Sequence, residues 1–395
     1  MKYKSLLFLI AFLSYTNVSF SQEFIQAYAD VVNQCTQTNI TDNLTQFQSL
    51  GVKRRGTTAL QNTLDWLKSE YLSYGYTASQ MVEDSYTYSG SPAVCKNLIL
   101  TKIGTIYPNT YVIVCGHYDT VSGTGTNDNG SGTSIILEIA RLLQNVPTEY
   151  SIKFINFSGE EDGLRGSQHY VNAIVNGTTP KMDIKVVFNI DEVGGVAGEI
   201  NDTITCDVDE SSPTSNNAAS VVVTDELATC VGLYSPLNTW INFAEATDYI
   251  PFENNGEIIT GFYETNISSH PHTPSDNLAN MDQEYCFNVA KAAIGATMHY
   301  AIAVTTLNAT DYNSDFQVSF YPNPTRDLLT INKGILTDKD YTFSLIDIHG
   351  KKVLTQNFTA ASLLETTDVS GLSSGIYLGV LETESQRITK KIVIQ

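Results

Sequence analysis

The sequence predicts an α/β protein with a mostly parallel sheet sandwiched by helices, followed by a small C-terminal all-β sandwich. Apolar runs alternate with segments of helical spacing over residues 22–308, and this alternation is typical of a parallel sheet with both faces covered. Beyond this region, helical periodicity gives way to short strand-like runs separated by turn signals. The predicted parts are a signal peptide (1–21), a large α/β domain (22–308), a linker (309–315) and an all-β module (316–395).

Eight segments of the large domain have a pattern of apolar residues that predicts a strand or a helix. Short apolar or alternating runs predict strands at residues 111–115, 151–157, 185–190 and 257–263. Apolar residues at helical spacing predict helices at residues 130–143, 164–175, 218–231 and 281–303.

The first residues predict export. Lys2 and Lys4 precede a short apolar run at residues 6–13, and Ser19 and Ser21 stand before an expected cleavage site ahead of Gln22. The apolar run is too short to span a bilayer, and no later segment has the roughly 18 apolar residues that a membrane helix needs. We therefore expect a secreted protein, extracellular or at the cell surface, without a membrane span.

The net charge and the cysteine spacing disfavour two classes of function, nucleic-acid binding and a cysteine zinc site. The formal net charge of −20 disfavours binding to nucleic acid phosphates. The six cysteines permit disulfides in an exported chain but do not define them, and no CxxC spacing points to a cysteine zinc site.

Metal-type side chains follow the predicted strands of the large domain. His117 follows the strand at 111–115, the Glu160-Glu161 pair follows the strand at 151–157, and Asp191 follows the strand at 185–190. Because active sites of parallel α/β sheets form at the carboxyl ends of the strands, we expect these loops to converge on one crevice.

The residue types indicate zinc chemistry. Imidazole and carboxylate ligands suit zinc, and a carboxylate can bridge two ions that together activate water and polarise a carbonyl. Of the two adjacent carboxylates, one can bind metal while the other acts as a base. Asp119, two residues after His117, is placed to accept the second imidazole N–H.

Five segments together resemble the co-catalytic zinc aminopeptidases of the bacterial leucyl-aminopeptidase family, which are related to the glutaminyl cyclases. The matching segments, in the order of the family, are residues 116–120, 127–132, 159–167, 189–191 and 272–276. Each motif is weak evidence by itself, whereas the ordered set is highly specific for this family. The resemblance covers the catalytic domain.

The resemblance implies a site with two zinc ions per chain. His117 and Asp191 would hold one ion, Glu161 and His272 would hold the other, and Asp128 would bridge them. Glu160 corresponds to the general base. The implied substrates are peptides with a free N-terminus, and the implied fold is that of the zinc exopeptidases.

The chain also departs from its apparent relatives. Some of them carry a tyrosine before the last histidine ligand to stabilise the oxyanion, where this chain has Pro271; Tyr234 or Tyr249 could substitute. In some relatives a disulfide lies near the substrate pocket, and this favours a Cys206–Cys230 bond here, with other pairings open.

Several further polar residues of the large domain are not assigned as metal ligands. Glu192 could contact the substrate amine or support the metal ligands. The remaining histidines of the large domain are expected to be loop, packing or surface residues: His169, His270 and His299.

The C-terminal module resembles a type IX secretion sorting domain of type A. The segments that carry the resemblance are residues 321–324, 347–351, 372–377 and 389–395. It implies recognition by the type IX secretion machinery and no catalytic role. The alternative is a generic immunoglobulin-like accessory domain, but a sugar-binding platform would require an exposed aromatic cluster that this module lacks.

Other functions are compatible with the same metal core. A glutaminyl cyclase tends to work with one zinc, whereas this chain retains both His117 and Asp191. A carboxypeptidase is the second enzymatic alternative. A non-catalytic binding protein usually loses ligands or the base, and here all six residues are present.

Overall fold

The chain forms two compact units, residues 1–306 and 307–395. The computed structural model describes residues 22–90, 93–304, 319–332, 340–359, 364–383 and 387–395. The expected signal peptide and linker lie outside these residues. Across the described ranges, no helix is both long and apolar enough to cross a membrane.

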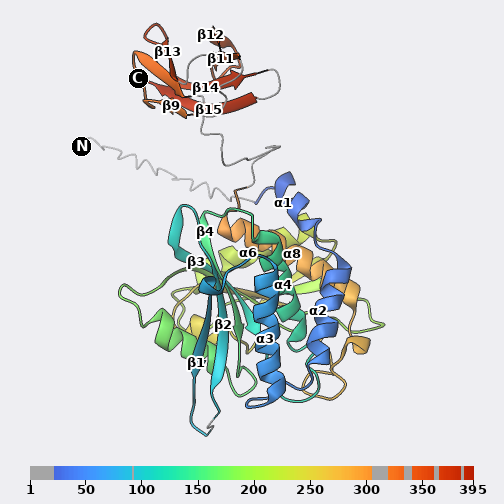
Figure 1. Ribbon diagram of the computed structural model, residues 1–395. Coiled ribbons are helices and arrows are strands. Elements are labelled where there is room, and N and C mark those ends of the chain that lie inside the picture. The colour runs from blue at the N-terminus through green and yellow to red at the C-terminus, as the bar shows by residue number, and fades with distance from the viewer. Residues whose placement is uncertain (1–21, 91–92, 305–318, 333–339, 360–363, 384–386) are drawn as a thin grey trace, which may run out of the picture. The chain divides into compact units, whose positions relative to one another are not determined.

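The larger unit is built on one mixed sheet of eight strands in the order β1-β2-β4-β3-β5-β8-β6-β7. Strands β1 to β4 of this sheet are labelled in Figure 1. The strands are β1 (Met81–Tyr86), β2 (Cys95–Lys102), β3 (Tyr107–His117), β4 (Tyr150–Phe157), β5 (Asp183–Ile190), β6 (Thr203–Val208), β7 (Asn238–Phe243) and β8 (Ile259–Glu264). The central strands β4, β3, β5 and β8 are parallel, while β1, β2 and β6 introduce antiparallel pairs. The predicted α/β class is confirmed, with a mixed sheet whose parallel part is central.

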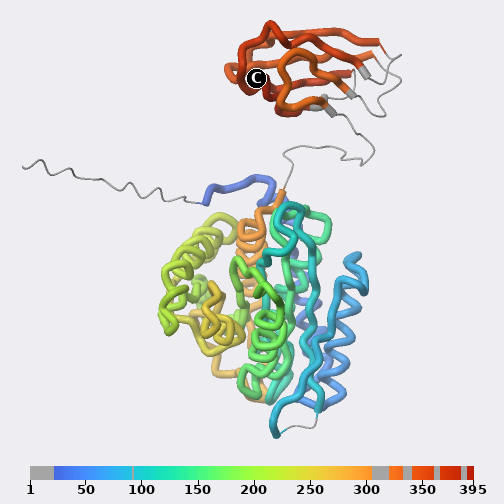
Figure 2. The backbone as a smooth tube through the Cα atoms, turned by 90° about the vertical axis from the view of Figure 1, so that its left-hand side faces the viewer, coloured from blue at the N-terminus to red at the C-terminus, as the bar shows by residue number. Residues whose placement is uncertain are grey.

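Helices cover both faces of this sheet (Figure 2). The helices are α1 (Gln26–Val32), α2 (Gln37–Ser49), α3 (Thr58–Ser73), α4 (Gly130–Leu143), α5 (Arg165–Tyr170) continued by a π-helical turn (Val171–Val175), α6 (Asn217–Tyr234), α7 (Ile250–Asn254) and α8 (Gln283–Ala301), with short 3-10 turns at Ala78–Gln80 and Leu278–Asn280. Alternate residues of each strand point to opposite faces. In β3, Val112 and Val114 accordingly pack in the core that contains α4 and α8, whereas Ile113 and Cys115 pack with α5 and α7.

A close approach at Gly132 brings the start of α4 against the end of β5. A Cβ atom at this position would lie 2.1 Å from the carbonyl oxygen of Ile190, so only glycine fits without displacing backbone. Asn129 caps the helix, accepting a hydrogen bond from the backbone N–H of Gly132, and donates to Ile190 O at 2.8 Å. The loop before α4 is thereby fixed beside the loop after β5.

The described residues of the smaller unit form two antiparallel sheets, in agreement with the predicted all-β module. Its strands are β9 (Ser319–Tyr321), β10 (Leu328–Asn332), β11 (Tyr341–Ile346), β12 (Lys352–Phe358), β13 (Leu364–Asp368), β14 (Gly375–Glu382) and β15 (Arg387–Ile394). The sheet orders are β13-β10-β9 and β12-β11-β14-β15. Both sheets contribute to one apolar core, with Leu329 and Ile331 from one and Phe343 and Ile392 from the other.

The expected Cys206–Cys230 disulfide is not formed in the structure, and this expectation is corrected. All six cysteines are free thiols and all are buried. The Cys230 thiol, on α6, instead donates a hydrogen bond to Oε1 of Gln22 at 2.8 Å.

Replacement of Tyr71 by phenylalanine is expected to destabilise the larger unit. The Tyr71 hydroxyl donates to Oδ1 of Asn156 at 2.8 Å, and both residues are fully buried. The Tyr71→Phe variant leaves that oxygen without its donor, at a cost of about 1–3 kcal/mol. Urea unfolding followed by tryptophan fluorescence measures this, because both tryptophans, Trp66 and Trp240, belong to this unit. The control is Tyr107→Phe at an exposed tyrosine; an equal loss in both variants would contradict the expectation.

Candidate metal centre

Three neighbouring strands deliver three of the five predicted ligands, together with Glu160, to one edge of the sheet. His117 is the last residue of β3, and Asp191 directly follows β5. Glu160 and Glu161 lie in the loop after β4. The strand ends meet because β4, β3 and β5 pair in parallel, as the sequence predicted.

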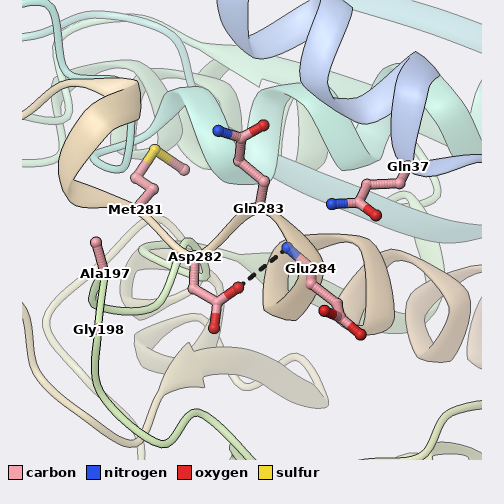
Figure 3. A pocket seen from close by; sticks show the side chains of 7 residues that line it. All are labelled: Gln37, Ala197, Gly198, Met281, Asp282, Gln283 and Glu284. Carbon is pink, nitrogen blue, oxygen red and sulfur yellow. Dashed lines mark hydrogen bonds between the residues drawn. The ribbon is translucent and has the colours of Figure 1, made fainter.

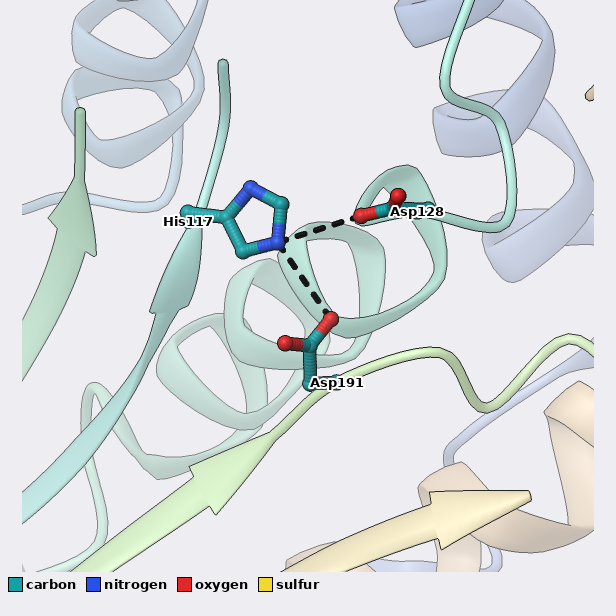
Figure 4. Close-up of side chains that lie close together, drawn as sticks. All are labelled: His117, Asp128 and Asp191. Carbon is teal, nitrogen blue, oxygen red and sulfur yellow. Dashed lines mark ion pairs between the residues drawn. The ribbon is translucent and has the colours of Figure 1, made fainter. Parts of the chain in front are cut away.

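Asp128 lies between the two histidines that the sequence singled out. Its Oδ1 is 3.2 Å from Nε2 of His117, and its Oδ2 is 3.1 Å from Nε2 of His272. Nε2 of His117 is also 3.4 Å from Oδ1 of Asp191 (Figure 4). Nε2 of His272 is 2.9 Å from Oε2 of Glu161. One carboxylate therefore faces both imidazoles, each of which has a further carboxylate beside it.

The side chains form two groups that share Asp128 and could each hold a metal ion. One group is His117, Asp128 and Asp191, the other is Asp128, Glu161 and His272, and the donor atoms of each lie within 4.8 Å of one another. Atoms bound at about 2.0–2.2 Å to one tetrahedral zinc lie roughly 3.3–3.6 Å apart, close to the observed separations. Oδ1 of Asp191 is also buried without a hydrogen-bond partner among the described residues, so the donor set fits a cation.

Burial and mutual repulsion shift the acidity of the site. Burial, together with the Asp128 carboxylate, raises the pKa of Glu161 to about 8. Burial also raises the pKa of Asp128, but hydrogen bonds from His117 and His272 outweigh it, and the net pKa lies below the usual value. Burial lowers the pKa of His117, but Asp191 and Glu160 bring it well above 6.5. A bound divalent cation would favour the ionised carboxylates and the neutral imidazoles.

Glu160 stands beside the donor groups without belonging to either. Its Oε2 is 4.0 Å from Nε2 of His117. Burial raises its pKa to about 10, with Asp248 and Asp191 adding repulsion against the attraction of His117. A carboxyl group so placed can exchange protons next to the cation site.

The expected contact between the Asp119 carboxylate and His117 is corrected. The backbone carbonyl of Asp119 faces Nδ1 of His117 at 3.1 Å, whereas its nearest carboxylate oxygen is 3.8 Å away. That oxygen, Oδ1, instead accepts a hydrogen bond from the backbone N–H of Glu160 at 3.3 Å. Asp119 thus orients the imidazole through its backbone and the base loop through its side chain.

Three supporting residues have roles that the sequence analysis did not assign. The Asp276 carboxylate accepts hydrogen bonds from the backbone N–H groups of Asn127 at 2.7 Å and Asp128 at 3.1 Å. The Thr247 hydroxyl donates to Oδ2 of Asp191, and the Tyr263 hydroxyl donates to Oε1 of Glu192. Asp276 belongs to a segment that carried the family resemblance, but nothing in the sequence around Thr247 or Tyr263 marked a contact with the site.

The tyrosines suggested for oxyanion stabilisation are engaged elsewhere. The Tyr234 hydroxyl pairs with Nε2 of His299, and the Tyr249 hydroxyl donates to Oδ2 of Asp207, both at 2.8 Å. His169 pairs with Asp84, and His270 with Ser275. In the described part of the chain, none of these histidines joins a metal-type group.

A separate open depression of about 460 Å³ lies at the start of α8 (Figure 3). It is lined by Gln37, Ala197, Gly198, Met281, Asp282, Gln283 and Glu284. Asp282 uses its side chain to cap α8, accepting from the backbone N–H of Glu284 at 3.1 Å. None of the candidate metal ligands lines this depression.

With this geometry in place, comparison with known proteins identifies the family. Residues 97–297 match the profile of peptidase family M28, and residues 319–395 match the secretion system C-terminal sorting domain. The first match covers about half of the chain, and the protein belongs to peptidase family M28.

Individual relatives agree with this placement. The chain is 33% identical over 183 residues to aminopeptidase YwaD of Bacillus subtilis, covering 44% of this chain and 37% of that protein. It is 30% identical over 165 residues to leupeptin-inactivating enzyme 1 of Streptomyces exfoliatus, covering 40% of this chain and 36% of that protein. The chain thus spans well under half the length of these curated relatives.

Solved structures share the fold. The Legionella pneumophila LapA aminopeptidase superposes with a TM-score of 0.60 at 22% identity, covering 71% of this chain and 76% of that one. A glutaminyl cyclase from Macrostomum lignano superposes with a TM-score of 0.62 at 14% identity, covering 72% and 97%. At such identities the likeness establishes the architecture alone.

Substitution of Asp276 by asparagine is expected to weaken metal binding while leaving the fold intact. The amide group removes one acceptor and the negative charge that fix the Asp128 loop, and loss of such an outer contact lowers metal affinity about 10- to 100-fold. Titration of zinc against a competing chelator measures this. Asp202→Asn, at an exposed position, is the control, and equal affinities in both variants would refute the role of Asp276.

Proposed function

We propose that this protein is an exported zinc aminopeptidase that hydrolyses the first peptide bond of peptides with a free N-terminus. The observation that carries the proposal is the pair of three-residue donor groups sharing Asp128, with Glu160 next to them but outside both. Family membership and the printed names of its relatives, aminopeptidases and zinc metalloproteases among them, support zinc as the ion. His117 and Asp191 would hold one ion, and Glu161 and His272 the other, with Asp128 bridging.

Bound zinc ions would polarise the scissile carbonyl and lower the pKa of an attacking water. Glu160 would accept a proton from that water and deliver it to the nitrogen of the leaving peptide, as a general base and then a general acid. Its burial suits this task, because a buried carboxyl group near other carboxylates holds a proton more readily than an exposed one. The backbone carbonyl of Asp119 would hold His117 in the orientation that directs Nε2 toward the ion.

The completeness of both donor groups favours an aminopeptidase over a glutaminyl cyclase. A cyclase acts on an N-terminal glutamine and releases ammonia, so the two functions differ in their products. Incubation of the zinc-loaded protein with unblocked peptides, beside N-acetylated copies, separates them by mass spectrometry. Stepwise loss from the N-terminus in the unblocked set alone is the expected result. Loss from the C-terminus, or of ammonia from glutamine alone, would overturn the proposal.

The Glu160→Gln variant is expected to retain its zinc and to lose turnover by about 10²- to 10⁴-fold, because the amide cannot accept the proton from water. Peptide hydrolysis and zinc content are measured on the same preparation. Glu210→Gln, at an exposed glutamate, is the matched control. A Glu160→Gln variant with nearly normal turnover would remove Glu160 from the mechanism.

We also propose that the type IX secretion machinery exports the protein by recognising the C-terminal module. Removal of residues 319–395, which match the sorting domain, is expected to reduce the protein outside the native cell at least tenfold. Immunoblots of cell and medium fractions measure this. The full-length Glu160→Gln variant is the control and is expected to reach the outside normally. Undiminished export of the truncated chain would contradict the sorting role.

A further inference from the structure

Glu192 is a carboxylate beside the metal centre that belongs to neither donor group. It directly follows Asp191, and its backbone adopts a left-handed conformation with φ of 43°. The carbonyl of Glu192 accepts from the backbone N–H of Glu264 at 2.9 Å, and the next N–H, of Val193, donates to Oγ of Ser131 at 3.0 Å. A residue of a type that rarely takes this conformation is thus held in it by two hydrogen bonds to the peptide group that follows it.

Among the described residues, only one oxygen of the Glu192 carboxylate has a hydrogen-bond partner. The Tyr263 hydroxyl, on β8, donates to Oε1, while Oε2 has no hydrogen bond to any described residue. Glu192 is partly exposed, and no lysine, arginine or histidine among the described residues forms an ion pair with it. Glu192 lies beside one donor group because it directly follows the candidate ligand Asp191, and its hydrogen bond from Tyr263 brings that tyrosine to the same place.

The neighbouring Glu264 is a carboxylate with a purely structural role, and its hydrogen bonds differ from those of Glu192. Glu264 is fully buried and accepts hydrogen bonds from Asn127, Gly195 and Ser268. Its oxygens are therefore occupied by the protein. Glu192, with one oxygen oriented by a tyrosine and the other without a partner among the described residues, has the features of a carboxylate that meets a ligand.

We propose that Glu192, oriented by Tyr263, binds the ammonium group of the first residue of the substrate. This inference rests on the proposed aminopeptidase function and assigns the group that recognises a free N-terminus. The terminal nitrogen is separated by one carbon atom from the carbonyl that is attacked, so its acceptor must lie next to the metal ligands, where Glu192 stands. An ammonium–carboxylate hydrogen bond is charge-assisted, and a neutral, acylated terminus cannot form it.

The Glu192→Gln variant tests this assignment, because glutamine keeps the shape and can still accept from Tyr263. The expected result is a KM raised about 10- to 100-fold for every unblocked peptide, whatever its first residue, with kcat within a few fold of the original. Zinc content stays unchanged. Glu199→Gln, at an exposed position later in the same loop, is the control and keeps the original KM.

Two further measurements distinguish binding from other roles. Free leucine is expected to inhibit the original enzyme at least tenfold better than N-acetylleucine, and Glu192→Gln is expected to abolish that preference. Tyr263→Phe is expected to raise KM by a smaller factor at nearly constant kcat, since it frees Glu192 without removing it.

Three outcomes would overturn the assignment. An unchanged KM with retained preference for free leucine would make Glu192 structural. A raised KM confined to peptides that begin with lysine or arginine would make it part of a side-chain pocket. A fall in kcat alone would give it or Tyr263 a role in the chemical step. Failure of the proposed function is a different result, in which the original enzyme does not shorten unblocked peptides from the N-terminus.

Discussion

The convergence of acidic side chains at one buried point is the constraint on which the rest of the larger unit depends. Asp128, Glu160, Glu161 and Asp191 lie around two imidazoles, and each is at least mostly buried. Buried carboxylates at such distances repel one another and lose their hydration, so they require positive charge. The two imidazoles supply part of it, and the donor geometry suits cations that would supply the rest.

The scaffold fixes the positions of these groups through strand pairing, close packing and backbone hydrogen bonds. Parallel pairing of β4, β3 and β5 sets three strand ends side by side, and Gly132 allows α4 to approach them closely. Asp276 ties down the Asp128 loop through two backbone N–H groups. In a site preorganised in this way, ordering of the side chains costs little free energy when an ion or a substrate binds.

Much of this arrangement could be predicted from the sequence, because the relevant segments have strong local patterns. The apolar run before His117 and the helical spacing after Asp128 defined β3 and α4, and strand-end placement then predicted which side chains converge. The edge strand β7 had no such signal, since five of its six residues are exposed and show no alternation of burial. The pattern also could not show that β2 pairs antiparallel with β1 and β4, or β6 with β8, because strand direction depends on distant partners.

The finer contacts of the site lay beyond sequence reasoning for a related reason. Spacing placed Asp119 near His117, but only the folded loop shows that its backbone carbonyl, not its carboxylate, meets the imidazole. Thr247, in a loop, and Tyr263, on β8, are both remote in sequence from the residues that they contact at the site. The Cys206–Cys230 pairing was wrong because it rested on a disulfide of some relatives, whereas in this chain the Cys230 thiol meets the Gln22 side chain.

The most direct test of the central claim is a crystal structure of the zinc-loaded protein with anomalous data collected at the zinc edge. The account predicts two zinc peaks per chain, one contacted by His117 and Asp191 and the other by Glu161 and His272, with Asp128 touching both. A single peak, or peaks outside these side chains, would contradict the account.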